Sequence, residues 1–424
     1  MPKATLRTAT LGCKVNQYET EYVRQGLLEA GYHDADDDRP ADLCLVNTCT
    51  VTAQGDAKSR QVIRRMARRN PDARIVVMGC YATRAPDEVA RLPNVAEVIT
   101  DKRELHDLLQ RYGVLHIPSG ISRFGTRHRA YVKVQDGCLL RCSFCIIPHV
   151  RPNMASRPVA DIVDEVRRLV DHGYREIVLT GIHLGHYGVD FNRNRPKSRW
   201  VRLSSLLALL VEVEGDFRIR LSSIEATEIT RELIDVMARH PRRICPHLHV
   251  SMQSGSDAVL RRMRRRWGSR RVVDRCLLIK ETLDQPALTT DIIVGFPGET
   301  EADFVATCRA IEEIGFSKIH AFPFSPRAGT AAADMPDQVP HAVKSGRGRR
   351  LAKLERRLRE RYYGSLEGRR LRVLVEGPRK DDASRMVGTA CRYAPVELAL
   401  SIARPGELVD VTAGATRDGR ILAC

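Results

Sequence analysis

Three cysteines stand close together in the segment QDGCLLRCSFC, at Cys138, Cys142 and Cys145. Cysteine thiolates at such short spacing are typical ligands of a metal centre. A structural zinc ion takes four ligands in a closed tetrahedron, and His149, four residues beyond Cys145, could supply the fourth. A [4Fe–4S] cluster also normally takes four thiolates, so three would leave one iron open to another molecule. The segment therefore predicts a metal centre, with these two kinds of centre as alternatives.

Three more cysteines follow predicted strands in the first part of the chain. Cys13, Cys49 and Cys80 come directly after the stretches TATLG, LVNT and VVMG. Because the carboxyl ends of parallel strands meet at one edge of a sheet, we expect the three thiols to lie near one another. Chance placement as core cysteines is the alternative, but three cysteines at three equivalent strand ends favour a second site.

The elements around these cysteines are predicted to alternate between strand and helix. This alternation over residues 1–115 is typical of a doubly wound parallel sheet. The predicted strands cover 4–11, 42–48, 73–79 and 95–100, and the predicted helices cover 16–31, 55–70, 85–92 and 102–113.

A polar link over 118–129 leads into a second α/β series within residues 124–355. Six strand-and-helix units are too few for a closed eightfold barrel and instead predict a partial (βα)6 barrel. In such a fold ligands lie at the carboxyl ends of the strands, and Cys138 follows the first of them. The predicted strands cover 130–135, 176–181, 218–223, 247–252, 288–296 and 318–324.

The end of the chain has a different pattern. A long basic helix is predicted over 341–366, and residues 364–424 then show short strands and turns over 369–377, 384–398 and 407–421. Short strands without helices predict a small β-barrel. The fold class is therefore α/β, with a doubly wound sheet, a partial barrel and a small β-barrel in that order.

The charge of the chain indicates a polyanionic partner. Lysine and arginine number 69 against 52 acidic residues, which gives a formal net charge of +17. The excess is clustered in RRMARRN, RRMRRRW and KSGRGRRLAKLERRLRERYY, which favours nucleic acid over a general arginine bias. No apolar run is long enough for a membrane span or a signal peptide, so we expect a cytoplasmic protein without disulfides.

The CxxxCxxC spacing after the first strand of a partial barrel resembles the radical S-adenosylmethionine (SAM) superfamily. The resemblance implies that the open iron chelates SAM and that electron transfer cleaves SAM to a 5′-deoxyadenosyl radical, which removes hydrogen from carbon. It also implies SAM contacts at later strand ends, in TGIHLG, LSSIEATEIT, HVSMQSGSD and IVGFPGET. The candidate contacts are Gly181, Ser223, Glu225, Gln253 and Ser254, each of which could instead belong to an ordinary strand-to-helix turn.

The whole chain, including NTCTVT and GCYATR, resembles the methylthiotransferase family. The resemblance implies a second, auxiliary [4Fe–4S] cluster on Cys13, Cys49 and Cys80, with an open iron for the sulfur that reaches the substrate. It also implies that the last region is a TRAM domain that binds RNA. The partners implied are tRNA, an electron donor such as flavodoxin or ferredoxin, and a sulfur source.

The segments TLGCKVNQYETE, SMQSGSDAVLRRMRRRW and HAFPFSPRAGT resemble the group that acts on N6-threonylcarbamoyladenosine (t6A) in tRNA. The implied reaction replaces the C2–H of t6A, beside the anticodon, with a methylthio group. Methylthiotransferases of isopentenyl-adenosine or of a ribosomal protein, another radical SAM enzyme, and an RNA-binding protein with structural zinc stay as alternatives.

Overall fold

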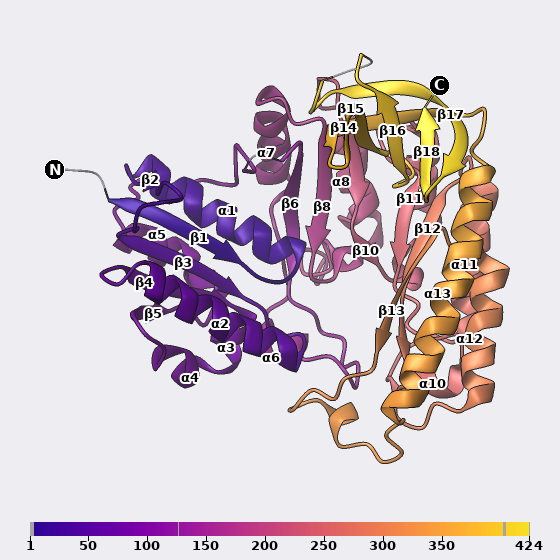
Figure 1. Cartoon of the computed structure of the whole chain (residues 1–424), viewed down its shortest axis with the longest axis horizontal. Helices are drawn as coiled ribbons and strands as arrows, with labels where there is room; N and C mark the ends of the chain where they lie inside the picture. Colours follow the sequence, from indigo (N-terminus) through magenta and orange to yellow (C-terminus); the bar gives the residue numbers. More distant parts are fainter. Residues whose placement is uncertain (1–3, 126, 402–403, 424) are drawn as a thin grey trace.

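The computed structural model describes residues 4–125, 127–401 and 404–423. The chain forms three regions that follow one another in sequence: an N-terminal sheet, a central partial barrel and a C-terminal barrel (Figure 1). None of the described helices is both long and apolar enough to cross a membrane.

The N-terminal region is a parallel sheet in the order β2-β1-β3-β4-β5, with helices on both faces. The aliphatic residues of each strand alternate between the two faces, so that Leu45 packs with α1 residues such as Val23 and Val46 packs with Ile63 of α2. The elements are β1 (Thr5–Thr10), α1 (Lys14–Glu29), β2 (His33–Asp34), β3 (Leu43–Thr48), α2 (Ala53–Arg69), β4 (Arg74–Gly79), α3 (Cys80–Arg84), α4 (Pro86–Ala90), β5 (Val95–Val98), η1 (Lys102–Glu104) and α5 (Leu105–Arg111).

The central region is an open barrel whose strands are parallel except for the short edge strand β7. Two four-stranded sheets, β7-β6-β8-β9 and β10-β11-β12-β13, form its wall, and the helices cover the outer face (Figure 1). The strands are β6 (Arg129–Asp136), β7 (Ala155–Ser156), β8 (Glu176–Gly181), β9 (Arg218–Leu221), β10 (Ser223–Ile224), β11 (His247–Val250), β12 (Ala287–Val294) and β13 (Lys318–Pro323). The helices are α6 (Ile147–Val150), α7 (Val159–Asp171), η2 (Leu184–His186), η3 (Lys197–Arg199), α8 (Leu203–Leu210), η4 (Ala226–Glu228), α9 (Arg231–Arg239), α10 (Asp257–Arg262), α11 (Ser269–Thr282), α12 (Glu301–Ile314), η5 (Ala331–Ala333) and α13 (His341–Gly364).

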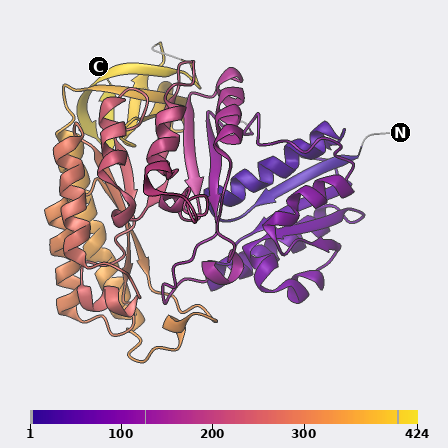
Figure 2. The ribbon, with the colours of Figure 1, turned by 180° about the vertical axis from the view of Figure 1, so that it is seen from behind.

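The C-terminal region is a closed barrel in the order β14-β15-β16-β18-β17. It lies over the amino ends of the central strands, as the view from behind also shows (Figure 2). Its strands are β14 (Arg370–Arg379), β15 (Asp382–Ala390), β16 (Pro395–Ala399), β17 (Leu408–Arg417) and β18 (Arg420–Ala423).

A buried ion-pair group joins the two barrels. Arg218 and Arg220 bond to Glu176 at 2.6 and 2.9 Å, and both also donate to carbonyl oxygens of the C-terminal barrel, among them that of Thr389 at 2.8 Å. Burial alone would raise the pKa of Glu176, but the two guanidinium groups hold it well below its ordinary value. The C-terminal barrel is therefore fixed to the end of the central barrel that is opposite the predicted ligand side.

The predicted fold class is confirmed, and the differences are local. The single strand expected over 218–223 is divided at Ser222 into β9 and β10, at the boundary between the two four-stranded sheets. The stretches 384–398 and 407–421 each contain two strands joined by a turn. The two-residue strands β2 and β7 were not predicted, because strands this short carry no periodic pattern.

Candidate metal centres

The structure brings the three N-terminal cysteines to one edge of the sheet. Cys13 follows β1, Cys49 follows β3 and Cys80 begins α3 after β4. The order of the strands reverses between β1 and β3, which is where doubly wound sheets bind ligands. A Cβ placed on Gly12 would lie 3.3 Å from the Cys49 sulfur, so the first two strand ends are in close contact.

The three central cysteines lie in the loop that follows β6. The Cys145 amide donates to the Cys142 carbonyl at 3.1 Å, which closes a tight turn between these two residues. Gly137 precedes Cys138 with a φ of 74°, and a Cβ there would overlap the Asn153 carbonyl. Any other residue at position 137 would therefore strain the backbone at the start of this loop.

The two sets of thiols fit a cluster better than a single ion. All six cysteines are free thiols. Tetrahedral zinc with bonds of about 2.3 Å requires sulfur atoms about 3.8 Å apart. Among the described residues, the groups of potential ligands within 4.8 Å of one another are made of histidine and carboxylate, and neither cysteine set is one of them. Neither set therefore has the compact arrangement of a single tetrahedral ion, and His149 does not join Cys138, Cys142 and Cys145 in such a group.

Arginine or histidine side chains contact one sulfur atom of the N-terminal cysteine set and two sulfur atoms of the central set. Arg151 Nε donates to Cys80 Sγ at 3.4 Å, and Arg265 Nη1 donates to Cys142 Sγ at 3.3 Å. His183 Nδ1 lies 3.3 Å from Cys138 Sγ. Such contacts to sulfur stabilise thiolate and tune a bound cluster. Burial raises the pKa of Cys138 to about 11, so the bare thiol stays protonated at neutral pH and a cationic centre is needed to hold it as thiolate.

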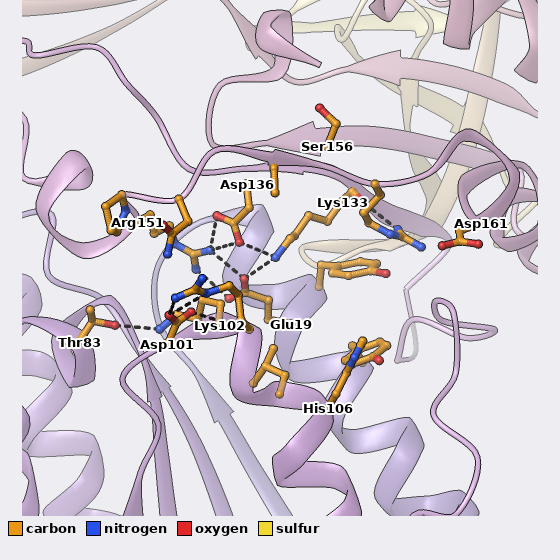
Figure 3. A pocket seen from close by; sticks show the side chains of 18 of the residues that line it. Glu19, Thr83, Asp101, Lys102, His106, Lys133, Asp136, Arg151, Ser156 and Asp161 are labelled. Carbon is orange, nitrogen blue, oxygen red and sulfur yellow. Dashed lines mark hydrogen bonds and ion pairs between the residues drawn. The ribbon is translucent and has the colours of Figure 1, made fainter. Parts of the chain in front are cut away.

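Arg151 is the residue that contacts both cysteine sites. Its side chain reaches Cys80, while its carbonyl accepts the Cys138 amide at 3.3 Å. The guanidinium is buried and pairs with Glu19 of α1 at 2.7 Å and with Asp136 of β6 at 2.8 Å. Figure 3 shows this group at one end of a cavity of about 670 Å³ between the N-terminal region and the central barrel.

The charges in this junction are matched. Lys133 bonds to the carboxylates of Glu19 at 2.8 Å and Asp136 at 2.6 Å, so two cations face two anions (Figure 3). Burial would raise the pKa of Glu19, but Arg151 and Lys133 lower it to about 2. Removal of either cation would leave two buried carboxylates sharing the one that remains, and this uncompensated buried charge is destabilising.

A second buried arginine joins the central region to the N-terminal region beside Cys49. Arg327, in the loop after β13, donates to the Thr50 hydroxyl at 2.5 Å and to Asp56 at 2.6 Å. Arg84 joins the same pair, with 2.6 Å to Asp56. Thr50 follows Cys49 directly, so the central region fixes the N-terminal site beside two of its cysteines.

Of the predicted SAM contacts, Glu225 is joined to the central cysteine loop through Arg265, while Ser223 lies on β10 and Gln253 follows β11. Glu225 pairs with Arg265, which also contacts Cys142. Gln253 has a φ of 66°, a strained conformation that is common at functional sites. Ser223 is exposed, and its hydroxyl lies 2.7 Å from that of Ser251.

The structure gives the other two predicted contacts different neighbours. Ser254 is fully buried, and its hydroxyl lies 3.2 Å from that of Thr307 in α12, so it faces a helix and not the strand ends. The close approach at Gly181 is to Gln135, because a Cβ there would lie 3.0 Å from the Gln135 amide oxygen. Both residues remain predicted SAM contacts.

Sequence reasoning missed the basic residues of these sites. Arg151, Arg265 and Arg327 are three among many arginines, and only the fold sets them against a cysteine or its neighbour. His183 stands in the quoted stretch TGIHLG, and its second nitrogen is 2.5 Å from Glu228. That histidine, two residues beyond the predicted strand over 176–181, was the one signal in the sequence.

Comparisons with known proteins agree with this geometry. A family model described as the radical SAM superfamily matches residues 132–311, and one described as uncharacterized protein family UPF0004 matches residues 5–101. Threonylcarbamoyladenosine tRNA methylthiotransferase MtaB of Bacillus subtilis is 43% identical, over 93% of this chain and 90% of that protein. The protein of the same name from Thermotoga maritima is 38% identical, over 88% and 86%. The tRNA-2-methylthio-N(6)-dimethylallyladenosine synthase of Corynebacterium urealyticum is 36% identical, over 96% and 80%.

Solved structures support the fold. The radical SAM methyltransferase TsrM from Kitasatospora setae superposes with a TM-score of 0.58 at 15% identity, over 78% of this chain and 77% of that one. The radical SAM enzyme OxsB superposes with a TM-score of 0.55 at 12% identity, over 84% and 56%. The chain belongs to the radical SAM methylthiotransferase family, whose chemistry uses SAM and a [4Fe–4S] cluster.

Proposed function

We propose that this protein is a tRNA methylthiotransferase that replaces the C2–H of t6A, at the position 3′ of the anticodon, with a methylthio group. The single observation that carries the chemistry is the pair of three-thiol sites that Arg151 joins. The relatives named for t6A, at up to 43% identity, support the choice of substrate.

Cys138, Cys142 and Cys145 would hold the SAM-binding cluster, which when bound supplies the electron for the cleavage of SAM. The residues around it are fixed for that task. Arg265 holds Glu225 beside Cys142, and Glu228 holds His183 beside Cys138. We expect Glu225 and Gln253 to contact SAM, because they lie at the ends of neighbouring strands next to this loop.

Cys13, Cys49 and Cys80 would hold the second cluster, at which the sulfur for the substrate is bound. In this proposal one SAM provides the methyl group, another provides the radical that takes the C2 hydrogen, and an external sulfur source provides the sulfur. Arg151 and Arg327 keep the site against the central barrel. An electron donor such as flavodoxin or ferredoxin completes the set of partners.

The proposal divides the chain into three functional domains, at 1–115, 124–355 and 364–424. The last of these would bind the tRNA as a TRAM domain. A net charge of +17 supports contacts with phosphates. Relatives that act on dimethylallyladenosine share less identity than the MtaB protein of Bacillus subtilis, 36% against 43%, so t6A is the preferred substrate.

The test of the substrate is mass spectrometry of tRNA nucleosides after deletion of the gene. We expect 2-methylthio-t6A to disappear and t6A to accumulate, and both changes to reverse when the gene is restored. Persistence of 2-methylthio-t6A would contradict the proposal. Loss of 2-methylthio-dimethylallyladenosine in its place would favour the other tRNA substrate.

The test of the cofactors is analysis of the anaerobically purified protein. Two [4Fe–4S] clusters give about eight irons per chain. One zinc and no iron would instead support an RNA-binding protein with a structural metal. Affinity for tRNA should also fall steeply with added salt, and a filter-binding assay that found no salt dependence would contradict phosphate contacts as its main source.

A further inference from the structure

Three neighbouring strands of the central barrel carry polar residues on their inner faces. Residues on their outer faces, including Val250 of β11, Ile292 of β12 and Ile319 of β13, pack into the core against the helices. Because side chains alternate along a strand, His249, Asp291 and His320 face the opposite way, into the barrel. The register pairs Asp291 with His320 on adjacent strands. We name these three inward-facing residues the polar wall.

Some side chains of the polar wall are hydrogen-bonded to one another, and some are exposed to solvent. His249 Nε2 lies 3.2 Å from Asp291 Oδ2, and its Nδ1 lies 2.9 Å from the Thr289 hydroxyl, so both ring nitrogens are engaged. Asp291 keeps 32% of its side chain exposed, and His320 is exposed. No hydrogen bond joins the His320 ring to another side chain among the residues that the structure describes. One carboxylate oxygen and one imidazole are therefore available for a ligand.

The wall begins directly below the predicted SAM side. The Gln253 amide donates to the Asp291 carbonyl at 2.9 Å, and the Ile293 amide donates back to the Gln253 carbonyl at 2.9 Å. Asp291 is three residues, or about 10 Å, from the carboxyl end of β12. A molecule that reacts at the strand ends and extends into the barrel therefore reaches the wall.

The other end of this space is closed by the C-terminal barrel. Tyr393 stacks on His247 with ring centroids 4.8 Å apart, and Tyr393 is 41% exposed. Residues of the central region and of the C-terminal barrel thus meet at the amino end of β11.

We propose that the polar wall binds the N6-threonylcarbamoyl group of the substrate adenosine and thereby selects it, an inference that rests on the function proposed above. C2 is a ring carbon of adenine, and N6 is bonded to C6, on the other side of N1 from C2. When C2 is held at the strand ends, the N6 group extends away from them, towards the wall. The carbamoyl N–H donates to the Asp291 carboxylate, and His320 donates to an oxygen of the threonyl part.

The same contacts exclude an apolar N6 group. A dimethylallyl group has no hydrogen-bonding atom. Its burial against the wall would remove water from the Asp291 carboxylate without providing a replacement hydrogen bond. Sites built around hydrogen bonds reject analogues that lack the partner much more strongly than apolar sites reject polar ones. Lys318, two residues before His320 on β13, is paired with Glu355 at 3.3 Å and offers a further cation on this strand for the threonyl carboxylate.

A metal ion is the competing occupant, because ligand atoms of the three residues lie within 4.8 Å of one another. The distance of 3.2 Å between His249 Nε2 and Asp291 Oδ2 fits a hydrogen bond, and it also fits two ligands of one metal ion bonded at about 2.0–2.2 Å. The test must therefore measure metal as well as substrate.

The experiment uses the reconstituted full-length enzyme and three synthetic anticodon stem-loops. At the same position, one carries t6A, one carries N6-dimethylallyladenosine and one carries adenosine. We expect Asp291→Leu and His320→Leu to lower kcat/KM for the t6A RNA about 10- to 100-fold, mainly through KM. The ratio of kcat/KM for the t6A RNA to kcat/KM for the dimethylallyladenosine RNA should fall by a similar factor. His320→Gln keeps a donor and should recover part of the loss.

The controls separate this loss from misfolding. Each variant must keep the iron content and melting temperature of the wild type, and His33→Leu, at an exposed strand edge, should change nothing. If Asp291→Leu does not fold, His320→Leu at its exposed position still decides the question.

Three results would overturn the proposal in distinguishable ways. Wild-type enzyme that modifies t6A, with variants that keep full kcat/KM and selectivity, refutes the polar wall alone. Wild-type enzyme that prefers the dimethylallyl RNA refutes the proposed function and the wall together. A stoichiometric metal other than cluster iron that is lost in His320→Leu makes the wall a metal site.

Discussion

The N-terminal cysteines come from three strand ends that are distant in sequence, whereas the central cysteines come from one loop. The N-terminal set exists only when β1, β3 and β4 are paired in register and α1 is packed on them. The central set needs one loop and the residues that hold it. Two sites with the same number of thiols thus depend to very different degrees on tertiary structure.

Both sites nevertheless share one local feature, a glycine with a positive φ directly before a cysteine. Gly12, Gly79 and Gly137 each precede a cysteine, and their φ angles are 102°, 101° and 74°. Backbone in this region disfavours any side chain, and it turns the chain sharply as it leaves a strand. The comparison suggests that local turns aim the thiols in both sites, while long-range contacts bring them together only in the N-terminal one.

The largest expected effect separates the two sites by chemistry. Cys142→Ala should abolish the cleavage of SAM, because it removes a ligand of the SAM-binding cluster. Cys49→Ala should spare reductive cleavage of SAM but stop thiolation. The measurements are 5′-deoxyadenosine and methylthio-nucleoside yields by mass spectrometry. Loss of cleavage in both variants would mean that the two sites do not work separately.

The next effect tests the glycine turns. Gly79→Ala would place a Cβ against the Thr48 backbone, so we expect the N-terminal iron to be lost and the central iron to be kept. Gly137→Ala would press on Asn153 and should do the reverse. Iron content, together with the remaining Mössbauer or EPR signal, reports which cluster survives.

Gly346→Ala is the matched control for these variants. Gly346 lies inside α13 with nothing within 4 Å of the added Cβ, so the change should leave iron unchanged and stabilise the helix slightly. If both turn variants lost the same cluster, the proposed independence of the two turns would be refuted.

A smaller effect, shared by the two sites, is expected at their junction. Arg151→Met removes one of the two cations between Glu19 and Asp136 and leaves Lys133 as the other, and the resulting uncompensated buried charge should cost up to about 3–5 kcal/mol in the free energy of unfolding. We expect both clusters to be lost faster to a chelator than in the wild type. Arg167→Met, at an exposed arginine with 59% of its side chain accessible, should change the unfolding free energy little. A variant that loses stability but releases only one cluster faster would show that Arg151 supports one site.

The smallest effects compare the hydroxyl next to a cysteine in each site. Thr50 bonds with Asp56, Arg84 and Arg327, whereas the Ser143 hydroxyl donates once, to the Arg262 carbonyl at 2.7 Å. Thr50→Val leaves charged partners unsatisfied and should cost about 1–3 kcal/mol, against about 1 kcal/mol for Ser143→Ala. Thermal unfolding measures both, and an equal or reversed cost would argue that the N-terminal site depends no more on distant contacts than the central one.

The sequence predicted most of the fold, because its helices and strands follow clear periodic patterns. The long helices α1, α2 and α13 and the parallel order of both α/β regions were all predicted. The break between β9 and β10 was not, since residues 218–223 form an uninterrupted strand-like pattern and only the boundary between the sheets divides it.

The candidate sites were predicted to the extent that cysteine is rare and its spacing is informative. The sequence by itself determined two groups of three thiols and the strand ends that carry them, because strand periodicity and turn residues are local properties. Only the tertiary structure decided that Arg151 contacts both groups, that Ser254 faces a helix, and that His249, Asp291 and His320 share one wall. Arginine and histidine are spread along this chain, and their roles depend on which strands pair and which faces turn inward, so no spacing in the sequence distinguishes the few that matter.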